Sequence, residues 1–218
     1  MFRVIDMERW PRKEHYAYYR DRLKCTYSLT ASLDVTSLVN QTKEKNLKFY
    51  PVFVYCAARV VNATPEFRMG TDPEGNPGYW DVMHPSYTIF HEDDHTFSDV
   101  WTYYNEDFGS FYQAMTGDMK TYGSQKGVKV KDGQPPNFFC ISCVPWISYS
   151  GYHTSCVDAS PNLFPILTFG KYEEKNGKTE MPFTVTIGHA AADGYHTAHF
   201  IQDVQNMVNE IQIEIEGS

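Results

Sequence analysis

A histidine and an aspartate near the carboxyl end of the chain have the residue types and spacing for proton-transfer chemistry. His189 follows the run 183–187, which is typical of a strand, and precedes an amphipathic helical pattern. The ordinary pKa of a histidine side chain is about 6.5, so a neutral imidazole can take a proton from a hydroxyl and return it within one turnover. The small alanines at 190–192 would let a ligand or another chain approach, and Asp193 follows them.

The chemistry of Asp193 leaves several roles open. Its carboxylate could orient the imidazole, cap the helix that starts near Gly194, or pair with a buried cation. Together with a serine, Ser142, the same two residues could also form the triad of a hydrolase. No Gly-x-Ser-x-Gly sequence surrounds Ser142, which counts against that alternative.

The elements that must position these residues predict an α/β fold. Periodicity and turn residues predict helices at 10–23, from Asp34 towards 43–46, at 52–61, at 108–122 and at 194–211, and strands at 26–33, 80–82, 87–90, 138–144, 166–172 and 181–187. Turn formers at 72–78 predict an exposed hairpin, and Asn176-Gly177 predicts a tight turn between two strands. This order favours a two-layer sandwich with a mixed β-sheet, formed by residues 1–218 as a single domain.

Composition restricts the class of protein. The net charge of −8 has the wrong sign for gripping a phosphate backbone, so we expect no nucleic-acid partner. No apolar run approaches the roughly 20 residues of a spanning helix, so we expect no membrane partner and a cytoplasmic location. The five cysteines are an odd number within apolar sequence, which favours reduced thiols over a disulfide framework.

Two clusters could suggest a metal, and we interpret neither as a metal site. Cys140 and Cys143 have CxxC spacing, but they lie in an apolar strand and would need partners such as His153 and Cys156. The other cluster, which we interpret as a polar loop, comprises His91, Asp93, Asp94 and His95.

The segment at 189–194, His-Ala-Ala-Ala-Asp-Gly, resembles the His-x-x-x-Asp-Gly motif of the chloramphenicol acetyltransferase family and of the dihydrolipoyl acyltransferase cores. The lipoyl and linker segments that normally precede such cores are not seen, and other segments resemble the chloramphenicol acetyltransferases in order, nearly end to end. These segments are WPRKEH (10–15), KFYP (48–51), PEFRM (65–69), WD (80–81), FHE (90–92), TFS (96–98), SCVPW (142–146), FGKY (169–172) and MP (181–182).

The resemblance implies an acetyltransferase of the CoA-dependent acyltransferase fold, a homotrimer with active sites at subunit interfaces, and a role in antibiotic resistance. His189 would be the general base that removes a proton from an acceptor hydroxyl, which attacks the thioester of acetyl-CoA directly. Ser142 would donate to the oxyanion, and Thr168 would hold a water near the same intermediate. No metal is implied.

The resemblance also assigns supporting and binding residues. Asp193 would form a buried ion pair with Arg12, and breaking such a pair costs roughly 3–5 kcal/mol. Lys48 and Lys171 would lie near the phosphates of CoA and Tyr172 beside its adenine. The acceptor pocket would be lined by Tyr18, Tyr19, Leu23, Cys25 and Tyr27, which could equally form an aromatic helix face buried in a core.

Two departures from the family pattern bear on the substrate. The family usually has His-His-Ala-Val-Cys-Asp-Gly, whereas this chain has Gly188 before the histidine and Ala192 before the aspartate. The segment 151–165 also departs, and the resemblance implies that it supplies part of the wall near the acceptor. We therefore expect O-acetylation of chloramphenicol or a similar small molecule, with two alternatives: a different acceptor, or a catalytically silent CoA-binding or assembly module.

Overall fold

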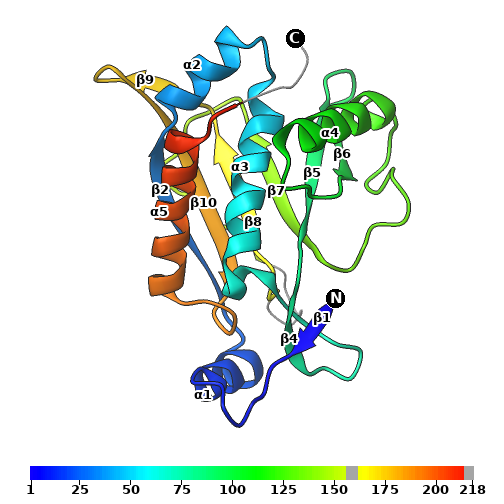
Figure 1. Cartoon of the computed structure of the whole chain (residues 1–218), viewed down its shortest axis with the longest axis vertical. Coiled ribbons are helices and arrows are strands. Elements are labelled where there is room, and N and C mark those ends of the chain that lie inside the picture. The colour runs from blue at the N-terminus through cyan, green and yellow to red at the C-terminus, as the bar shows by residue number, and fades with distance from the viewer. Residues whose placement is uncertain (156–161, 214–218) are drawn as a thin grey trace.

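A mixed sheet forms the centre of the computed structural model, which describes residues 1–155 and 162–213 (Figure 1). The order across the sheet is β2-β10-β8-β7-β5-β6, and β9 pairs with one end of β10. β7 is parallel to both β5 and β8, and the other pairs are antiparallel, which confirms the predicted mixed sheet. The seven strands are β2 (Thr26–Asp34), β5 (His84–His91), β6 (Thr96–Trp101), β7 (Phe138–Val144), β8 (Ile166–Gly170), β9 (Glu173–Lys175) and β10 (Lys178–Gly188).

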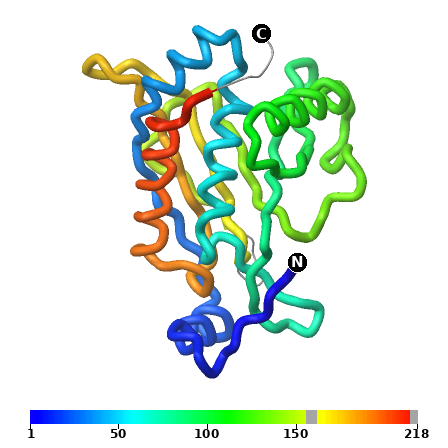
Figure 2. The backbone as a smooth tube through the Cα atoms, viewed as in Figure 1, coloured from blue at the N-terminus to red at the C-terminus, as the bar shows by residue number. Residues whose placement is uncertain are grey.

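One face of this sheet is covered by helices (Figures 1 and 2). The ring of Phe183 on β10 lies 5.7 Å from that of Phe53 and 6.5 Å from that of Phe200, so strand and helices share one core. None of the helices in the described ranges combines the length and apolar character that crossing a bilayer requires. The helices that follow β2 are α2 (Thr36–Glu44), α3 (Phe49–Ala63), α4 (Phe108–Tyr122) and α5 (Gly194–Glu210).

The amino-terminal part forms a smaller layer at one end of the molecule (Figure 2). Its sheet has the order β1-β4-β3, formed by β1 (Phe2–Val4), β4 (Pro77–Trp80) and β3 (Met69–Thr71). The helix predicted from Trp10 begins later, as α1 (Lys13–Ala17). A π-helical segment follows at Tyr18–Arg22, where the backbone N–H of Leu23 donates to the carbonyl of Tyr18 at 3.0 Å.

Several predicted boundaries were wrong because tertiary contacts override local signals. α3 begins two residues before Pro51, and the strand predicted at 80–82 is β4. Asp34 ends β2 and its Oδ1 accepts from Thr36, so the helix starts at Thr36. β6 was not predicted. The tight turn joins β9 to β10, with φ of 51° at Asn176 and 76° at Gly177, both in the left-handed region.

Alternation along β10 separates the two faces of the main sheet. Phe183 and Val185 belong to the helix-covered core, so Thr184 points to the opposite face. The strand register places Thr184 next to Thr168 of β8, and Thr168 next to Ser142 of β7. A row of hydroxyl side chains therefore crosses the face that the helices leave uncovered.

Candidate functional site

His189 lies in the turn that connects β10 to α5. Its backbone N–H donates to the carbonyl oxygen of Cys25 at 3.0 Å, which attaches this turn to the residue that precedes β2. The alanines at 190–192 are fully buried, so they pack in the core and do not form an approach for a ligand as the sequence suggested.

Aromatic rings hold the imidazole of His189. The ring of Tyr19 stacks on it with a centroid distance of 3.8 Å and an angle of 8°, and the ring of Tyr27 lies 5.1 Å away at a tilt. Nδ1 of His189 is enclosed and has no hydrogen-bond partner among the described residues. The ring is therefore fixed by stacking, and Nε2 is the nitrogen left for an external partner.

Tyr27 also brings a polar group close to this imidazole. Its hydroxyl forms a 2.5 Å hydrogen bond with Oγ1 of Thr197 on α5. Burial raises the pKa of Tyr27 to about 12, so the phenol is neutral at physiological pH. A neutral hydroxyl pair, with donor and acceptor capacity, thus lies beside His189.

The carboxylate of Asp193 has partners other than His189. Its Oδ2 accepts from Nη1 of Arg12 at 2.6 Å, and its Oδ1 lies 2.8 Å from Nδ1 of His196 and accepts from the backbone N–H of Tyr195 at 3.0 Å. Burial raises the pKa of Asp193, but the hydrogen bonds from Arg12 and His196 outweigh it and bring the pKa to about 2. Of the roles left open by the sequence, Asp193 has both the cation pair and the helix cap.

Ser142 and Thr168 are neighbours on the face without helices. They are paired in the parallel register of β7 and β8, and Thr168 is almost fully buried. The hydroxyl of Tyr149 donates to the carbonyl oxygen of Thr168 at 2.8 Å. The segment after β7 therefore covers this part of the hydroxyl row.

One chain does not bring Ser142 and His189 together. Ser142 lies in the register row of Thr184, and His189 follows Thr184 by five positions on β10. Five residues of extended strand span roughly 16 Å, and two strand spacings add roughly 10 Å across the sheet. The two side chains of one chain are therefore too far apart to act on the same substrate atoms.

The predicted acceptor residues form a partly exposed surface beside His189. Tyr19 and Tyr27 contact its ring directly. Tyr18 and Leu23 are 49% and 53% exposed, so the alternative of a buried aromatic core face does not hold for them. Cys25 is partly exposed and is attached to His189 through the backbone. Apolar surface is thus available here to a ligand or another chain.

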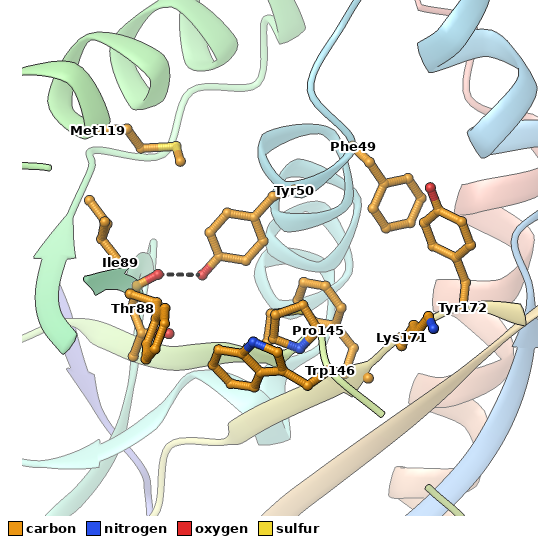
Figure 3. A pocket seen from close by; sticks show the side chains of 13 residues that line it. Phe49, Tyr50, Thr88, Ile89, Met119, Pro145, Trp146, Lys171 and Tyr172 are labelled. Carbon is orange, nitrogen blue, oxygen red and sulfur yellow. Dashed lines mark hydrogen bonds between the residues drawn. The ribbon is translucent and has the colours of Figure 1, made fainter. Parts of the chain in front are cut away.

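A cavity of about 570 Å³ lies on the helix-covered side, between α3, α4 and the ends of β7 and β8 (Figure 3). Two of the predicted CoA-binding residues, Lys171 and Tyr172, line it, and the ring of Tyr172 lies 5.2 Å from that of Phe49. Its volume and mostly apolar lining suit part of a CoA-sized ligand. The remaining lining residues are Tyr50, Thr88, Ile89, Phe90, Met119, Cys143, Pro145, Trp146, Phe169 and Gly170.

Other predicted residues lie outside this cavity. Lys48 lines a neighbouring cavity of about 560 Å³. Cys143 lines the first cavity, whereas the side chain of Ser142, the preceding residue on the strand, lies on the other face of the sheet. His189 lines neither cavity.

The structure adds two aromatic residues that the sequence did not place in the site. The hydroxyl of Tyr50 donates to the carbonyl of Thr88 at 3.2 Å across the cavity, and burial raises the pKa of Tyr50 (Figure 3). Trp146 is 55% exposed and packs edge-on against Phe90, with ring centroids 4.6 Å apart. The sequence could have indicated both residues, because Tyr50 and Trp146 lie in segments that carry the family resemblance.

The structure does not support the metal alternatives in the residues it describes. Cys140 and Cys143 are three positions apart on one strand, so their side chains point to opposite faces of the sheet. In 1–155 and 162–213, no group of three or more histidine, cysteine or acidic side chains is arranged to hold an ion. Cys156 lies outside the described residues. The free cysteines include Cys25 and Cys56.

Comparison with solved structures supports the same fold. A chloramphenicol acetyltransferase superposes with a TM-score of 0.84 at 24% identity, covering 95% of this chain and 100% of that one. A dihydrolipoamide acetyltransferase from Azotobacter vinelandii superposes with a TM-score of 0.66 at 17% identity, covering 85% of this chain and 82% of that one. The predicted fold of the CoA-dependent acyltransferase type is therefore confirmed.

Sequence comparison is more specific. The family model for chloramphenicol acetyltransferase matches residues 1–205. A chloramphenicol acetyltransferase from Clostridium butyricum is 41% identical over 216 residues, which cover 99% of each chain. Another, from Vibrio anguillarum, is 39% identical over 211 residues, which cover 97% of this chain and 96% of that one. By identity, coverage and the match to the family model, this chain belongs to the chloramphenicol acetyltransferase family.

Proposed function

We propose that the protein transfers the acetyl group of acetyl-CoA to a hydroxyl of chloramphenicol or a closely similar small molecule. The names and the near-complete coverage of its relatives support this reaction class. The observation that carries the proposal is the geometry of His189, whose ring is fixed by Tyr19 with Nδ1 enclosed. Such an imidazole has one nitrogen free for proton transfer in a defined orientation.

In the proposed reaction His189 acts as the general base. Nε2 takes the proton of the acceptor hydroxyl as that oxygen attacks the thioester carbonyl, and the proton later goes to the CoA thiolate that leaves. The acceptor oxygen gains the acetyl group and no acyl-enzyme forms. Asp193, held by Arg12 and His196, supports the turn that carries the base and takes no part in proton transfer.

Ser142 and Thr168 are proposed to stabilise the tetrahedral intermediate. The Ser142 hydroxyl would donate to the oxyanion, and Thr168, its neighbour across the strand pair, would hold a water beside it. Loss of one such donor typically lowers the rate by about 100-fold or more. Lys48, Lys171 and Tyr172 would bind CoA on the helix-covered side.

We further propose that the active sites lie between subunits of a homotrimer. The separation of Ser142 and His189 within one chain supports this, because two copies are needed to bring a base and an oxyanion donor together. The exposed side chains of Tyr18 and Leu23, next to His189, provide surface for such a contact. The enzyme would act in the cytoplasm on a diffusible substrate, and acetylation of the antibiotic would confer resistance.

One observation favours the alternative of a different acceptor. In His153, which lies in the segment that departs from the family pattern, Nδ1 is 2.8 Å from Oγ of Ser28, and the two atoms share a hydrogen bond. Ser28 in turn bonds to Oγ1 of Thr186 at 2.6 Å. This polar chain on the face that carries Ser142 would favour an acceptor with additional polar groups.

The decisive experiment follows CoA thiol release from acetyl-CoA with and without chloramphenicol. We expect release that requires the drug, an O-acetylated product by mass spectrometry, and a loss of about 10²- to 10⁴-fold in kcat for His189→Ala. His199→Ala, an exposed histidine on α5, is the matched control and should retain activity. Release without the drug would indicate thioester hydrolysis, and CoA binding without turnover of any hydroxylated acceptor would indicate a silent binding module.

A further inference from the structure

A second cavity, of about 560 Å³, lies between the start of α3 and the outer side of α4. Two lysines line it, Lys48 immediately before α3 and Lys120 on the last turns of α4. The other lining residues are Gln113, Thr116, Gly117 and Met119. The lining therefore carries two cations, whereas the first cavity has one, Lys171.

The two cavities are neighbours. Met119 lines both of them, and Phe49 of the apolar cavity follows Lys48 directly. The backbone N–H of Lys48 donates to the hydroxyl of Tyr112 on α4 at 3.0 Å. This bond holds the start of α3 against α4, so Lys48 and Lys120 line the same cavity.

No acidic side chain neutralises this site among the residues that line it. Asp118, the nearest carboxylate in sequence to Lys120, accepts from Oγ1 of Thr102 at 2.7 Å and pairs with Lys131 at 2.7 Å. It is thereby engaged with β6 and the loop that follows α4. In a chain with a net charge of −8, two lysines without a carboxylate on the same cavity wall make a local site for an anion.

We propose that Lys120 binds a phosphate of CoA together with Lys48, an inference that rests on the proposed function. CoA carries an adenine ring next to a diphosphate and a separate 3′-phosphate. The adenine ring matches the first cavity, where Tyr172 lies, and the phosphates match the second. Lys171 remains at the rim of the first cavity and can serve a different phosphate. Lys120 is therefore a specificity determinant for the nucleotide end of the acetyl donor.

The test compares donors that differ in phosphate content. Lys120→Ala should raise the KM for acetyl-CoA, and the Kd of CoA measured by calorimetry, about three- to tenfold with kcat unchanged. The KM for S-acetylpantetheine, which carries no phosphate, should be the same in the variant and the native chain. If Lys120→Ala raises the KM for acetyl-dephospho-CoA less than the KM for acetyl-CoA, Lys120 contacts the 3′-phosphate. If both KM values rise equally, Lys120 contacts the diphosphate. High salt should reduce the difference in the Kd of CoA between Lys120→Ala and the native chain, because it screens the charge of the lysine.

Matched variants separate charge from structure. Lys120→Arg keeps the cation and should bind CoA nearly as the native chain does, and Lys175→Ala, an exposed lysine of β9, should bind unchanged. An unchanged Kd for CoA in Lys120→Ala, or an equal rise in the KM for S-acetylpantetheine, would overturn the inference. Failure of the native protein to bind CoA would instead contradict the proposed function itself.

Discussion

At the scale of single residues, the histidine and the aspartate of the motif are held by separate sets of contacts. His189 is held by the faces of Tyr19 and Tyr27, whereas Asp193 is held by Arg12 and His196. Ser142 lies roughly 16 Å away along the strand direction, so the triad of a hydrolase does not form within one chain. The aspartate of the motif is thus a support of the turn.

Asp193→Asn tests this division of roles. Arg12 would lose its only described ionic partner while its Nε and Nη2 already lack hydrogen-bond partners, so we expect the free energy of unfolding at pH 7 to fall by about 2–4 kcal/mol. Because the pKa of Asp193 is about 2 in the folded chain against an ordinary 3.8, its stabilisation is present above pH 4 and disappears between pH 4 and pH 2.

Denaturant unfolding of both proteins at several pH values measures this difference. The difference in free energy of unfolding between the native chain and Asp193→Asn should disappear as the pH falls from 4 to 2. In a separate activity assay, the kcat of Asp193→Asn should be lower than that of the native chain, with the same pH profile. Asp6→Asn, which removes an exposed partner of Arg9, is the control and should cost less than about 0.5 kcal/mol. A gap that persists at pH 2 would contradict the assignment.

At the scale of elements, α4 has a stabilising cap at its first turn and residues of the proposed CoA-binding surface in its last turns. It supplies Met119 to one cavity and Lys120 to the other. Its first turn is capped by Asp107, whose Oδ1 accepts from the backbone N–H of Ser110 at 2.8 Å. The π-helical segment at Tyr18–Arg22 also positions a site residue, because it holds the ring of Tyr19 against His189.

Asp107→Ala should lower the free energy of unfolding, measured by denaturant unfolding, because a capping acceptor is lost from the start of a helix. Lys120 lies at the far end of the same helix, so the KM for acetyl-CoA should stay unchanged. Asp107→Asn retains a capping oxygen and should keep most of the stability. A change in KM with no change in stability would show that the cap acts on the binding surface directly.

At the scale of the whole molecule, the sheet separates Ser142 and Thr168 from His189 within one chain. Ser142 and Thr168 lie in one register row, and His189 lies beyond the end of β10. In the proposed mechanism, a complete site needs His189 of one copy beside Ser142 of another. The proposal therefore makes activity a property of the assembly.

Mixing two inactive variants tests the shared site. His189→Ala and Ser142→Ala should each fold, form trimers by size measurement, and have little activity. Dissociated and reassembled together, they should regain part of the native activity, because some interfaces combine an intact His189 with an intact Ser142 from the neighbouring copy. Mixed trimers without activity would contradict a site divided between subunits.

The sequence by itself determined much of the local structure. Apolar periodicity identified α4 and α5. Asn176-Gly177 identified a tight turn, because asparagine and glycine tolerate the positive φ that both positions have in the structure. The motif with His189, together with the other segments that follow the family's order nearly end to end, identified the family, which the family model confirms. These features depend on neighbours in the chain, which a sequence displays directly.

Only the tertiary structure decided how those features combine. The pairing of Ser142 with Thr168, and the distance of both from His189, follow from strand register, which no local pattern fixes. The partners of Asp193 follow from packing with Arg12, 181 positions away in the chain. The cavity that Lys48 and Lys120 both line likewise depends on how α3 and α4 pack. Contacts between distant segments form only when the core is complete, so their geometry is a property of the folded chain.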